Sequence, residues 1–227
     1  TLFPYTTLFR SERHQGTRRE RLESYGLGLV GQGAVGPSRV EQIDPITLKT
    51  LRRSPRLPGG PMWPGGMAIH RNGDIYVVYG RWAHRLSRAC VPLASLKLPI
   101  DQPYNSFVIL DNGLLVTKNL SDTTPARLSV IDPETLAPAG ADTVCPEPSI
   151  ARLSAVGNTV YVVGVRSLQR YHWDAGTRQL QPDPGWRWDY IGDSRQTYGW
   201  DAVLDGTDAW IEGNIFLHCH KNGSPDS

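Results

Sequence analysis

The stretch Phe107-Val-Ile-Leu-Asp-Asn-Gly113, followed by Leu114-Leu-Val-Thr117, decides how this chain folds. Two short apolar runs flank an Asn-Gly pair, which is the strongest short-range signal of a β-hairpin and predicts a tight primed turn with positive φ at both central residues. A further run, Arg127-Leu-Ser-Val-Ile-Asp132-Pro-Glu-Thr-Leu136, contains an Asp-Pro step that predicts a second turn. The stretch therefore predicts three or four short antiparallel strands and no helical period.

The same two markers recur along the chain at a fixed interval. Asp44, Ser87, Asp132 and Asp174 end equivalent runs and lie 43, 45 and 42 residues apart. Glycine-containing turns precede the apolar runs that begin at Ile75, Leu114, Val160 and Ala209. A period of about 40–45 residues is typical of a propeller blade of four strands. The prediction is an all-β fold, an incomplete β-propeller of about four to five blades, each with four antiparallel strands.

These repeats resemble those of bacterial quinoprotein-like propellers, the superfamily that includes pyrroloquinoline-quinone and YVTN-type repeat proteins. The resemblance rests on the strands Tyr76–Val78 and Tyr161–Val163 and on the Ile-Asp-Pro-x-Thr-Leu turns at Ile43 and Ile131. It covers about 190 residues and implies a fold rather than an activity. Cofactor-using members are expected to show adjacent cysteines, calcium-ligating carboxylates and paired tryptophans in each blade. None of these occurs here in that form, so no cofactor is predicted, and a quinone-cofactor dehydrogenase-like protein is kept as an alternative.

Three segments follow from the distribution of the markers. Residues 1–24 carry no blade pattern, and Thr1–Ser11 resembles a translated sequencing adapter, so a non-native or disordered leader is expected there. Residues 25–214 hold the predicted blades. Residues 215–227 carry no blade markers and are expected to be a divergent or truncated tail.

Composition excludes several classes of function. The formal net charge is +2, from 24 basic and 22 acidic residues, which gives no argument for nucleic acid or an anionic membrane as a partner. No apolar run approaches the ~18 residues that span a bilayer. Cys90, Cys145 and Cys219 are too widely spaced for a disulfide framework. His218 and His220 would share one strand face, but further ligands are not evident, so no metal is predicted.

Candidate binding residues come from the geometry of a propeller blade. Connections between blades and connections between the second and third strands share one face, at the mouth of the central channel. The residues that the repeats place there are Arg81, Trp82, Tyr104, Asn105, Lys118, Asn119, Arg152, Arg166, Trp200 and Asp201. The cationic and aromatic side chains would suit a small anionic or sugar-like ligand, through charge-assisted hydrogen bonds and stacking. The alternative is a set of solvated loop charges and loop-packing aromatics.

Two functions stay open at this point. The first is a non-catalytic module that binds a small anionic ligand or a protein partner at the channel mouth. The second is a propeller enzyme, an arylsulfotransferase-like transferase or a lyase, acting on a small anionic substrate. His84 follows one of the mouth loops and could serve as a general base, whereas His70 precedes a turn on the other face and is expected at the surface. Mouth-facing histidines with acid–base partners would favour the enzyme, and their absence would favour binding.

Overall fold

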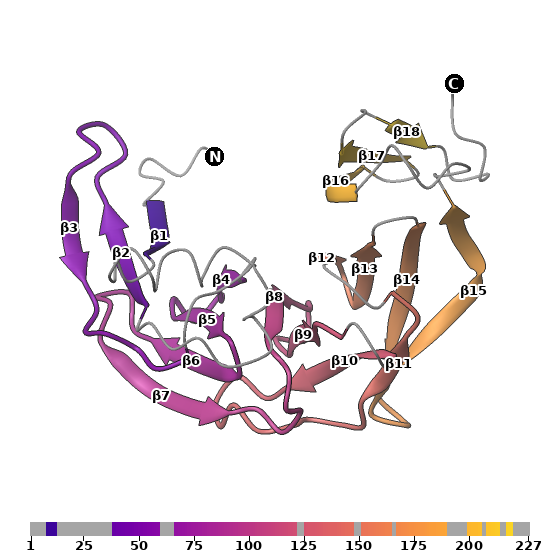
Figure 1. The fold of residues 1–227 in the computed structure, drawn as a ribbon, viewed down its shortest axis with the longest axis horizontal. Helices are drawn as coiled ribbons and strands as arrows, with labels where there is room; N and C mark the ends of the chain where they lie inside the picture. Colours follow the sequence, from indigo (N-terminus) through magenta and orange to yellow (C-terminus); the bar gives the residue numbers. More distant parts are fainter. Residues whose placement is uncertain are drawn as a thin grey trace. The chain divides into compact units, whose positions relative to one another are not determined.

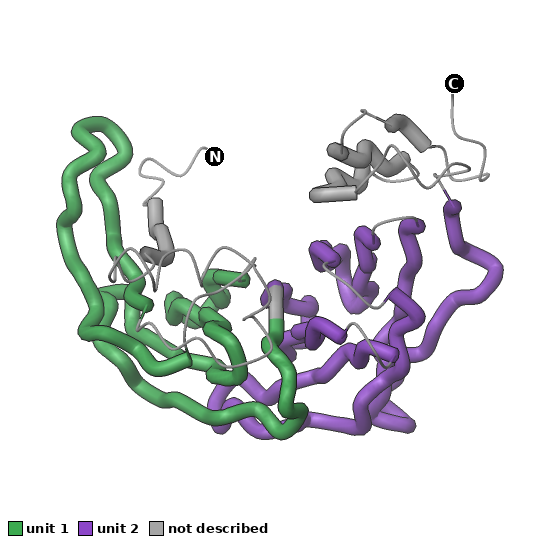
Figure 2. The backbone as a smooth tube through the Cα atoms, in the orientation of Figure 1, with its two compact units in different colours: residues 1–104 green, residues 105–227 purple. Residues whose placement is uncertain are grey.

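The structure, a computed structural model, describes residues 8–12, 38–59, 66–121, 125–147, 151–164, 167–189, 199–205, 208–213 and 217–219. All of the regular secondary structure in these ranges is β-strand, and the strands form antiparallel sheets (Figure 1). The chain divides into two compact units, unit 1 from Thr1 to Tyr104 and unit 2 from Asn105 to Ser227 (Figure 2). No helix in the described part of the chain is long and apolar enough to cross a membrane.

The described residues of unit 1 form two sheets. One is ordered β1 (Leu8–Glu12), β2 (Arg39–Ile43) and β3 (Thr50–Arg53), so that β1 lies within the segment expected to be a leader. The other runs in chain order through β4 (Met67–Ile69), β5 (Ile75–Tyr79), β6 (Trp82–Leu86) and β7 (Pro92–Lys97). All five residues of β5 are buried, which explains its continuous apolar sequence. Val40 and Leu57 pack with Ile75, Val77 and Leu86 in one core.

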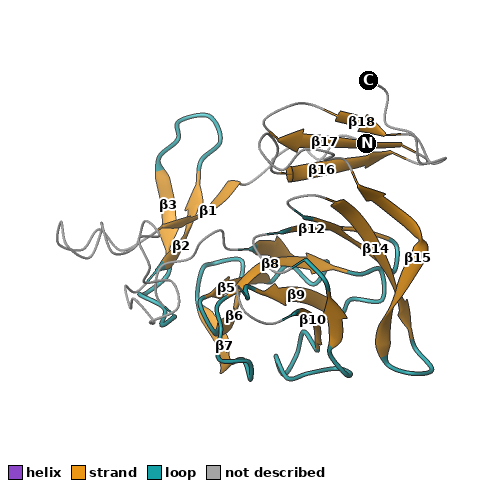
Figure 3. Ribbon diagram, turned by 45° about the vertical axis from the view of Figure 1, so that its right-hand side comes forward, coloured by secondary structure: helices purple, strands orange, loops and turns teal. Residues whose placement is uncertain are grey.

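The described residues of unit 2 form three sheets, and the strands of each sheet follow one another in chain order. The first has β8 (Tyr104–Ile109, which begins on the last residue of unit 1), β9 (Leu115–Asn119), β10 (Ala126–Ile131) and β11 (Thr143–Cys145). The second has β12 (Arg152–Val156), β13 (Thr159–Val163), β14 (Ser167–Asp174) and β15 (Gln179–Asp189). The third has β16 (Gly199–Asp205), β17 (Asp208–Gly213) and β18 (Leu217–Cys219), the last within the expected tail. Figure 3 shows these strands in a second orientation.

The predicted four-stranded antiparallel unit is confirmed. In β4–β7, β8–β11 and β12–β15 each strand pairs with the next one along the chain, and we name the four strands of a blade A to D in that order. In unit 2, apolar side chains from the first two sheets, among them Val116, Leu128, Val130, Val160 and Val162, share one core. Packed sheets of this kind bury the face that a single hairpin would leave in water, which is why one repeat cannot stand alone.

The A–B turns are hairpins, as predicted, but the predicted primed turn is wrong at two of them. Gly73 and Gly113 have φ of 90° and 89°, whereas neither preceding asparagine has a positive φ. The Gly73 N–H donates to the His70 carbonyl at 2.8 Å, and the His70 N–H donates to the Asp74 carbonyl at 2.9 Å. This is a three-residue loop with a glycine bulge. The asparagine acts through its side chain instead, since Asn72 Oδ1 accepts the Asp74 N–H at 2.9 Å.

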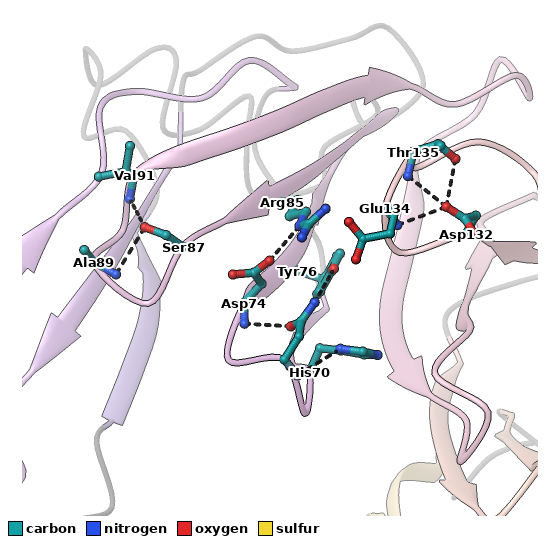
Figure 4. A network of polar contacts seen from close by, with 11 residues as sticks. His70, Asp74, Tyr76, Arg85, Ser87, Ala89, Val91, Asp132, Glu134 and Thr135 are labelled. Carbon is teal, nitrogen blue, oxygen red and sulfur yellow. Dashed lines mark hydrogen bonds and ion pairs between the residues drawn. The ribbon is translucent and has the colours of Figure 1, made fainter.

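The C–D turns share one hydrogen-bonding arrangement, in which a side-chain oxygen accepts backbone N–H groups, and this explains the recurring aspartate. Asp132 Oδ1 accepts the N–H groups of Glu134 and Thr135 at 3.0 and 2.8 Å, and Ser87 Oγ accepts those of Ala89 and Val91, both at 3.3 Å (Figure 4). A residue with positive φ then closes each turn. These residues are Cys90 (62°), Leu136 (60°) and Arg178 (52°), and Leu48 (56°) closes the equivalent turn between β2 and β3, which we also count as a C–D turn. Short polar side chains that bond to the backbone two to four residues on stabilise such turns, so the Asp-Pro prediction of a turn is confirmed.

Candidate functional site

Strand pairing places the described candidates at one end of each blade. Arg152, the first residue of β12, pairs with Val163, the last residue of β13, and Ser167 pairs with Asp189. In the preceding sheet, Lys118 near the end of β9 pairs with Leu128. Strand A therefore begins at the end of the sheet where strand B ends and strand C begins, as expected for a propeller blade. We call this edge of a sheet the A-start end.

In unit 1, Arg81 holds the connection between β7 and β8. Its guanidinium pairs with the Asp101 carboxylate and donates to the carbonyls of Leu98 and Pro99 at 3.2 and 3.1 Å. The backbone strengthens the same contact, because the Leu98 N–H donates to the Arg81 carbonyl at 2.7 Å. The side chain is 25% exposed. Its fork of donors is directed at the protein's own loop, an arrangement to which the planar arginine head is suited.

The aromatic candidates of unit 1 pack against their own sheet. Tyr104 is buried, and its hydroxyl accepts the Ile100 N–H at 3.2 Å. Trp82 is half-buried and stacks on His84, with ring centroids 6.4 Å apart and planes 7° from parallel. A large aromatic ring that is covered in this way contributes chiefly through the apolar area it buries.

His84 is a core residue and not an accessible base. It is fully buried, with Nδ1 2.7 Å from Ser95 Oγ and Nε2 2.8 Å from the Pro58 carbonyl. A carbonyl accepts only, so Nε2 carries the proton and Nδ1 accepts from the serine. Burial lowers the pKa of His84, and the hydrogen bond to the Pro58 carbonyl partly opposes that shift. The structure thus assigns a neutral imidazole that ties β6 to β7 and to the segment at Pro58.

The expected surface position of His70 is wrong. Its exposed fraction is 8%, because the ring packs edge-on against Tyr76 at a centroid distance of 5.8 Å. Its Nδ1 accepts the Asn72 N–H at 3.2 Å, so the side chain caps the turn that follows it (Figure 4). A turn residue is normally solvated, but here the apolar body of the ring covers the tyrosine.

In unit 2, Lys118 is buried among polar groups between two sheets. The side chain has no exposed surface, and Nζ donates to the Asn119 carbonyl at 3.1 Å. Burial lowers the pKa of Lys118, while the nearby Cys145 and Glu147 favour its charged form. Burial raises the pKa of the Cys145 thiol, and Lys118 is the largest opposing influence. Burial thus disfavours the charged form of this lysine, and the two neighbouring side chains partly offset that cost.

The neighbouring sheet completes this group through strand β14. Tyr171 donates from its hydroxyl to Gln169 Oε1 at 3.0 Å, and Gln169 Nε2 donates to Ser167 Oγ at 2.9 Å. Burial raises the pKa of Tyr171. Gly164 lies against the Glu147 carboxylate so closely that a methyl group would collide with it. We call the set the inter-blade polar cluster; its members are Lys118, Asn119, Cys145, Glu147, Ser167, Gln169 and Tyr171.

Sequence reasoning identified Lys118 and Asn119 but missed the other members of the cluster. Polar residues at alternate positions of Ser167-Leu-Gln-Arg-Tyr171 indicate one polar strand face, but they do not show that this face turns inward. It also missed a surface group on β14 and β15. There, Arg170 lies 4.7 Å from the Trp186 ring centroid and pairs with Asp183 at 2.7 Å. That pairing is the main cause of the lowered pKa of Asp183.

The remaining candidates are placed only in part. Arg152 is half-buried at the start of β12. Asn105 lies in β8, and Trp200 and Asp201 lie in β16, where the backbone alone is described. Arg166 lies outside the described residues. Within the described ranges, no group of three or more His, Cys, Asp or Glu side chains is placed to hold a metal ion.

Comparison with known proteins identifies the fold. No family model and no curated protein matches the sequence. Many solved structures match, and three of them show the range. The dihydro-heme d1 dehydrogenase NirN in complex with DHE is 14% identical, with a TM-score of 0.56 over 83% of this chain and 41% of that one. BBS1N in complex with ARL6DN is 12% identical, with a TM-score of 0.58 over 98% of this chain and 65% of that one. Virginiamycin B lyase from Staphylococcus aureus is 13% identical, with a TM-score of 0.53 over 78% of this chain and 56% of that one.

This chain has a β-propeller fold. The propeller blades are the four-stranded sheets β4–β7, β8–β11 and β12–β15. The chain spans 41% to 65% of the length of these three solved structures. Identities of 12% to 14% establish shared architecture, and propellers with this architecture include enzymes and binding proteins alike.

Proposed function

We propose that this β-propeller is a binding module that takes a small anionic ligand at the A-start end of unit 2. The observation that carries the proposal is the position of three basic residues at this end of the first two sheets of unit 2. Arg152 begins β12, Lys118 lies at the end of β9, and Arg187 lies near the end of β15. Basic groups in partly desolvated surroundings attract an anion more strongly than they would in water.

The three side chains have different roles in the proposal. Arg152 is half-buried at a strand start and supplies the direct contact, since a guanidinium matches carboxylate, sulfate and phosphate oxygens with paired donors. Lys118 is buried and contributes a charge from below the surface. An anion bound above it would favour the ammonium form, so ligand binding should be accompanied by proton uptake where Lys118 titrates. Arg187 is already paired with Asp189 at 2.8 Å and helps to shape this edge.

The positions of the histidines support binding over catalysis. In the described part of unit 2, His172 accompanies Thr159 and Asp183, at the end of β13 opposite to Arg152. In unit 1, His70 and His84 are buried, and their ring nitrogens are engaged by Asn72, Ser95 and the Pro58 carbonyl. A transferase or lyase needs a group that moves a proton within reach of the bound substrate. Among the described residues of β8–β15, the one histidine is His172, and it lies at the other end of its sheet.

The test is a screen of sulfated, phosphorylated and carboxylated small molecules by calorimetry on the full chain. For a ligand that binds, Arg152→Ala should weaken the affinity about tenfold or more, because a charge-assisted hydrogen bond contributes about 1.5–3 kcal/mol. Lys118→Met, which keeps the side-chain volume, should weaken binding and abolish the proton uptake. Arg88→Ala, an exposed arginine in a C–D turn of unit 1, is the matched control and should have no effect. Affinity that survives Arg152→Ala, or falls equally with Arg88→Ala, would refute the site.

A further inference from the structure

Strand β3 presents an exposed backbone edge at one side of its sheet. It is the outermost strand in the order β1-β2-β3 and pairs, among the described strands, with β2 alone (Figure 1). All four of its residues, Thr50 to Arg53, are exposed. A strand edge of this kind carries N–H and C=O groups that can pair with another chain. Natural proteins usually shorten or cover such an edge.

The same segment has a strong local charge. Residues 45–73 contain five Lys and Arg and no Asp or Glu, although the whole chain is close to neutral. Arg53 is engaged by the buried Glu41 carboxylate, which fixes the strand to β2. Lys49, Arg52 and Arg56 are exposed along and beside the strand. Basic side chains on both sides of a free edge favour an acidic partner and repel a second copy of the same edge.

Exposed apolar side chains accompany these charges. Ile46 and Leu48 in the β2–β3 turn are 88% and 69% exposed, and Leu51 within β3 is 55% exposed. Residues 38–59 contain no Phe, Tyr or Trp, so this surface lacks the aromatic rings on which single-stranded nucleic acid stacks. Exposed backbone, apolar side chains and basic groups in one strand match an extended peptide better than they match a polynucleotide.

We propose that β3 is a docking strand for an extended acidic segment of a partner protein. The segment adds to the sheet beside β3 through main-chain hydrogen bonds, its acidic side chains lie near Lys49, Arg52 and Arg56, and its apolar side chains cover Leu51. Main-chain pairing supplies affinity in this mode, and the side chains supply selectivity. This surface is separate from the ligand site proposed in unit 2, so either can fail alone.

The experiment uses the full chain and a fluorescent peptide of eight residues that alternates valine and glutamate. Fluorescence anisotropy should show binding that weakens as salt rises from about 0.1 M to 1 M, where the screening length falls from ~10 Å to ~3 Å. Arg52→Glu combined with Arg56→Glu should weaken binding at least tenfold, and Arg88→Glu should leave it unchanged. If the glutamate pair impairs folding, Arg52→Gln with Arg56→Gln removes the same charges more gently. On peptide addition, hydrogen exchange should slow at residues 50–53.

Control ligands separate strand addition from simple charge attraction. An acidic peptide of equal charge, with proline in place of valine, cannot pair along a strand and should bind at least tenfold more weakly. A single-stranded oligonucleotide should neither protect residues 50–53 nor displace the valine–glutamate peptide at equal concentration. Equal binding of the proline peptide, displacement by the oligonucleotide, or an unchanged affinity in the double variant would overturn the proposal.

Discussion

At the scale of single residues, the described histidines and Lys118 show how burial determines the role of a titratable group. Read from the sequence, His84 and Lys118 are loop-adjacent polar residues of the kind that form active sites. In the structure both side chains lose all contact with solvent. His84 becomes a neutral hydrogen-bonding link, and Lys118 becomes a buried amine whose pKa is lowered by burial and partly restored by Cys145 and Glu147. Removing a charge from water is costly, so burial favours the neutral form of His84. For Lys118, neighbouring groups partly offset the same cost.

His84 should make unit 1 less stable in mild acid. Because its folded pKa is lowered by burial, the unfolded chain takes up a proton first as the pH falls below about 6.5. The stability that the neutral imidazole contributes is therefore present above that pH and declines down to the folded pKa. Urea unfolding between pH 7 and pH 5 should show this slope, and His84→Gln should flatten it. His172→Gln, half-exposed in unit 2, is the matched control; a slope unchanged in His84→Gln would contradict the assignment.

At the scale of elements, the C–D turn is the most regular feature of the repeat. Asp44 and Asp132 each accept two backbone N–H groups, and a non-glycine residue with positive φ follows four positions later. These hydrogen bonds, that of Thr47 first, lower the pKa of Asp44. Leucine in the left-handed region costs about 1–2 kcal/mol, so the hydrogen bonds and packing of each turn must offset that strain.

Substituting glycine for the leucine that closes a C–D turn distinguishes the backbone strain of the turn from the packing of the side chain. Leu48 has φ of 56° and is 69% exposed, so Leu48→Gly should relieve strain and raise stability by about 0.5–1 kcal/mol after the entropy of glycine is counted. Leu136 has nearly the same φ, 60°, but is fully buried, so Leu136→Gly should lower stability by about 2 kcal/mol or more. Urea unfolding of both variants measures the difference. Destabilisation of similar size at the two positions would mean that the turn conformation carries no strain.

At the scale of the whole molecule, each of the two compact units has a hydrophobic core among its described residues. Val40, Ile75 and Leu86 belong to the core of unit 1, and Leu128 and Val160 belong to that of unit 2. In repeat architectures each unit is stabilised by itself and by its nearest neighbours, so a defect is expected to act locally.

Leu128→Ala should therefore loosen one unit selectively. The residue is fully buried between the first two sheets of unit 2, and its truncation should cost about 2–5 kcal/mol there. Native-state hydrogen exchange should become faster in β8–β15 and stay unchanged in β4–β7. Val77→Ala in β5 is the reciprocal control and should have the opposite pattern. Uniform acceleration along the chain in either variant would indicate a single cooperative unit.

The blades and their turns could be predicted from the sequence alone. The Asn-Gly and Asp-Pro markers act through contacts within about five residues, and the spacing of 42 to 45 residues between them is a property of the chain itself. The sequence placed the strand ends less well, since Tyr104 and Lys118 were expected in connections and lie within β8 and β9. The sequence did not determine the φ of Asn72, since a primed turn and a bulged loop both suit an Asn-Gly pair.

Only the tertiary structure decided which polar residues face water. Arg81 and Arg152 both stand at strand ends, yet a loop twenty residues away engages the first, and the second remains half-buried at the edge of its sheet. Lys118 and Tyr171 are brought together with Cys145 by the packing of one sheet on another, a contact between segments far apart in the chain. Local sequence sets backbone conformation, whereas the burial of a charge depends on which surfaces meet. For that reason the propeller fold follows from its repeats, and its binding chemistry does not.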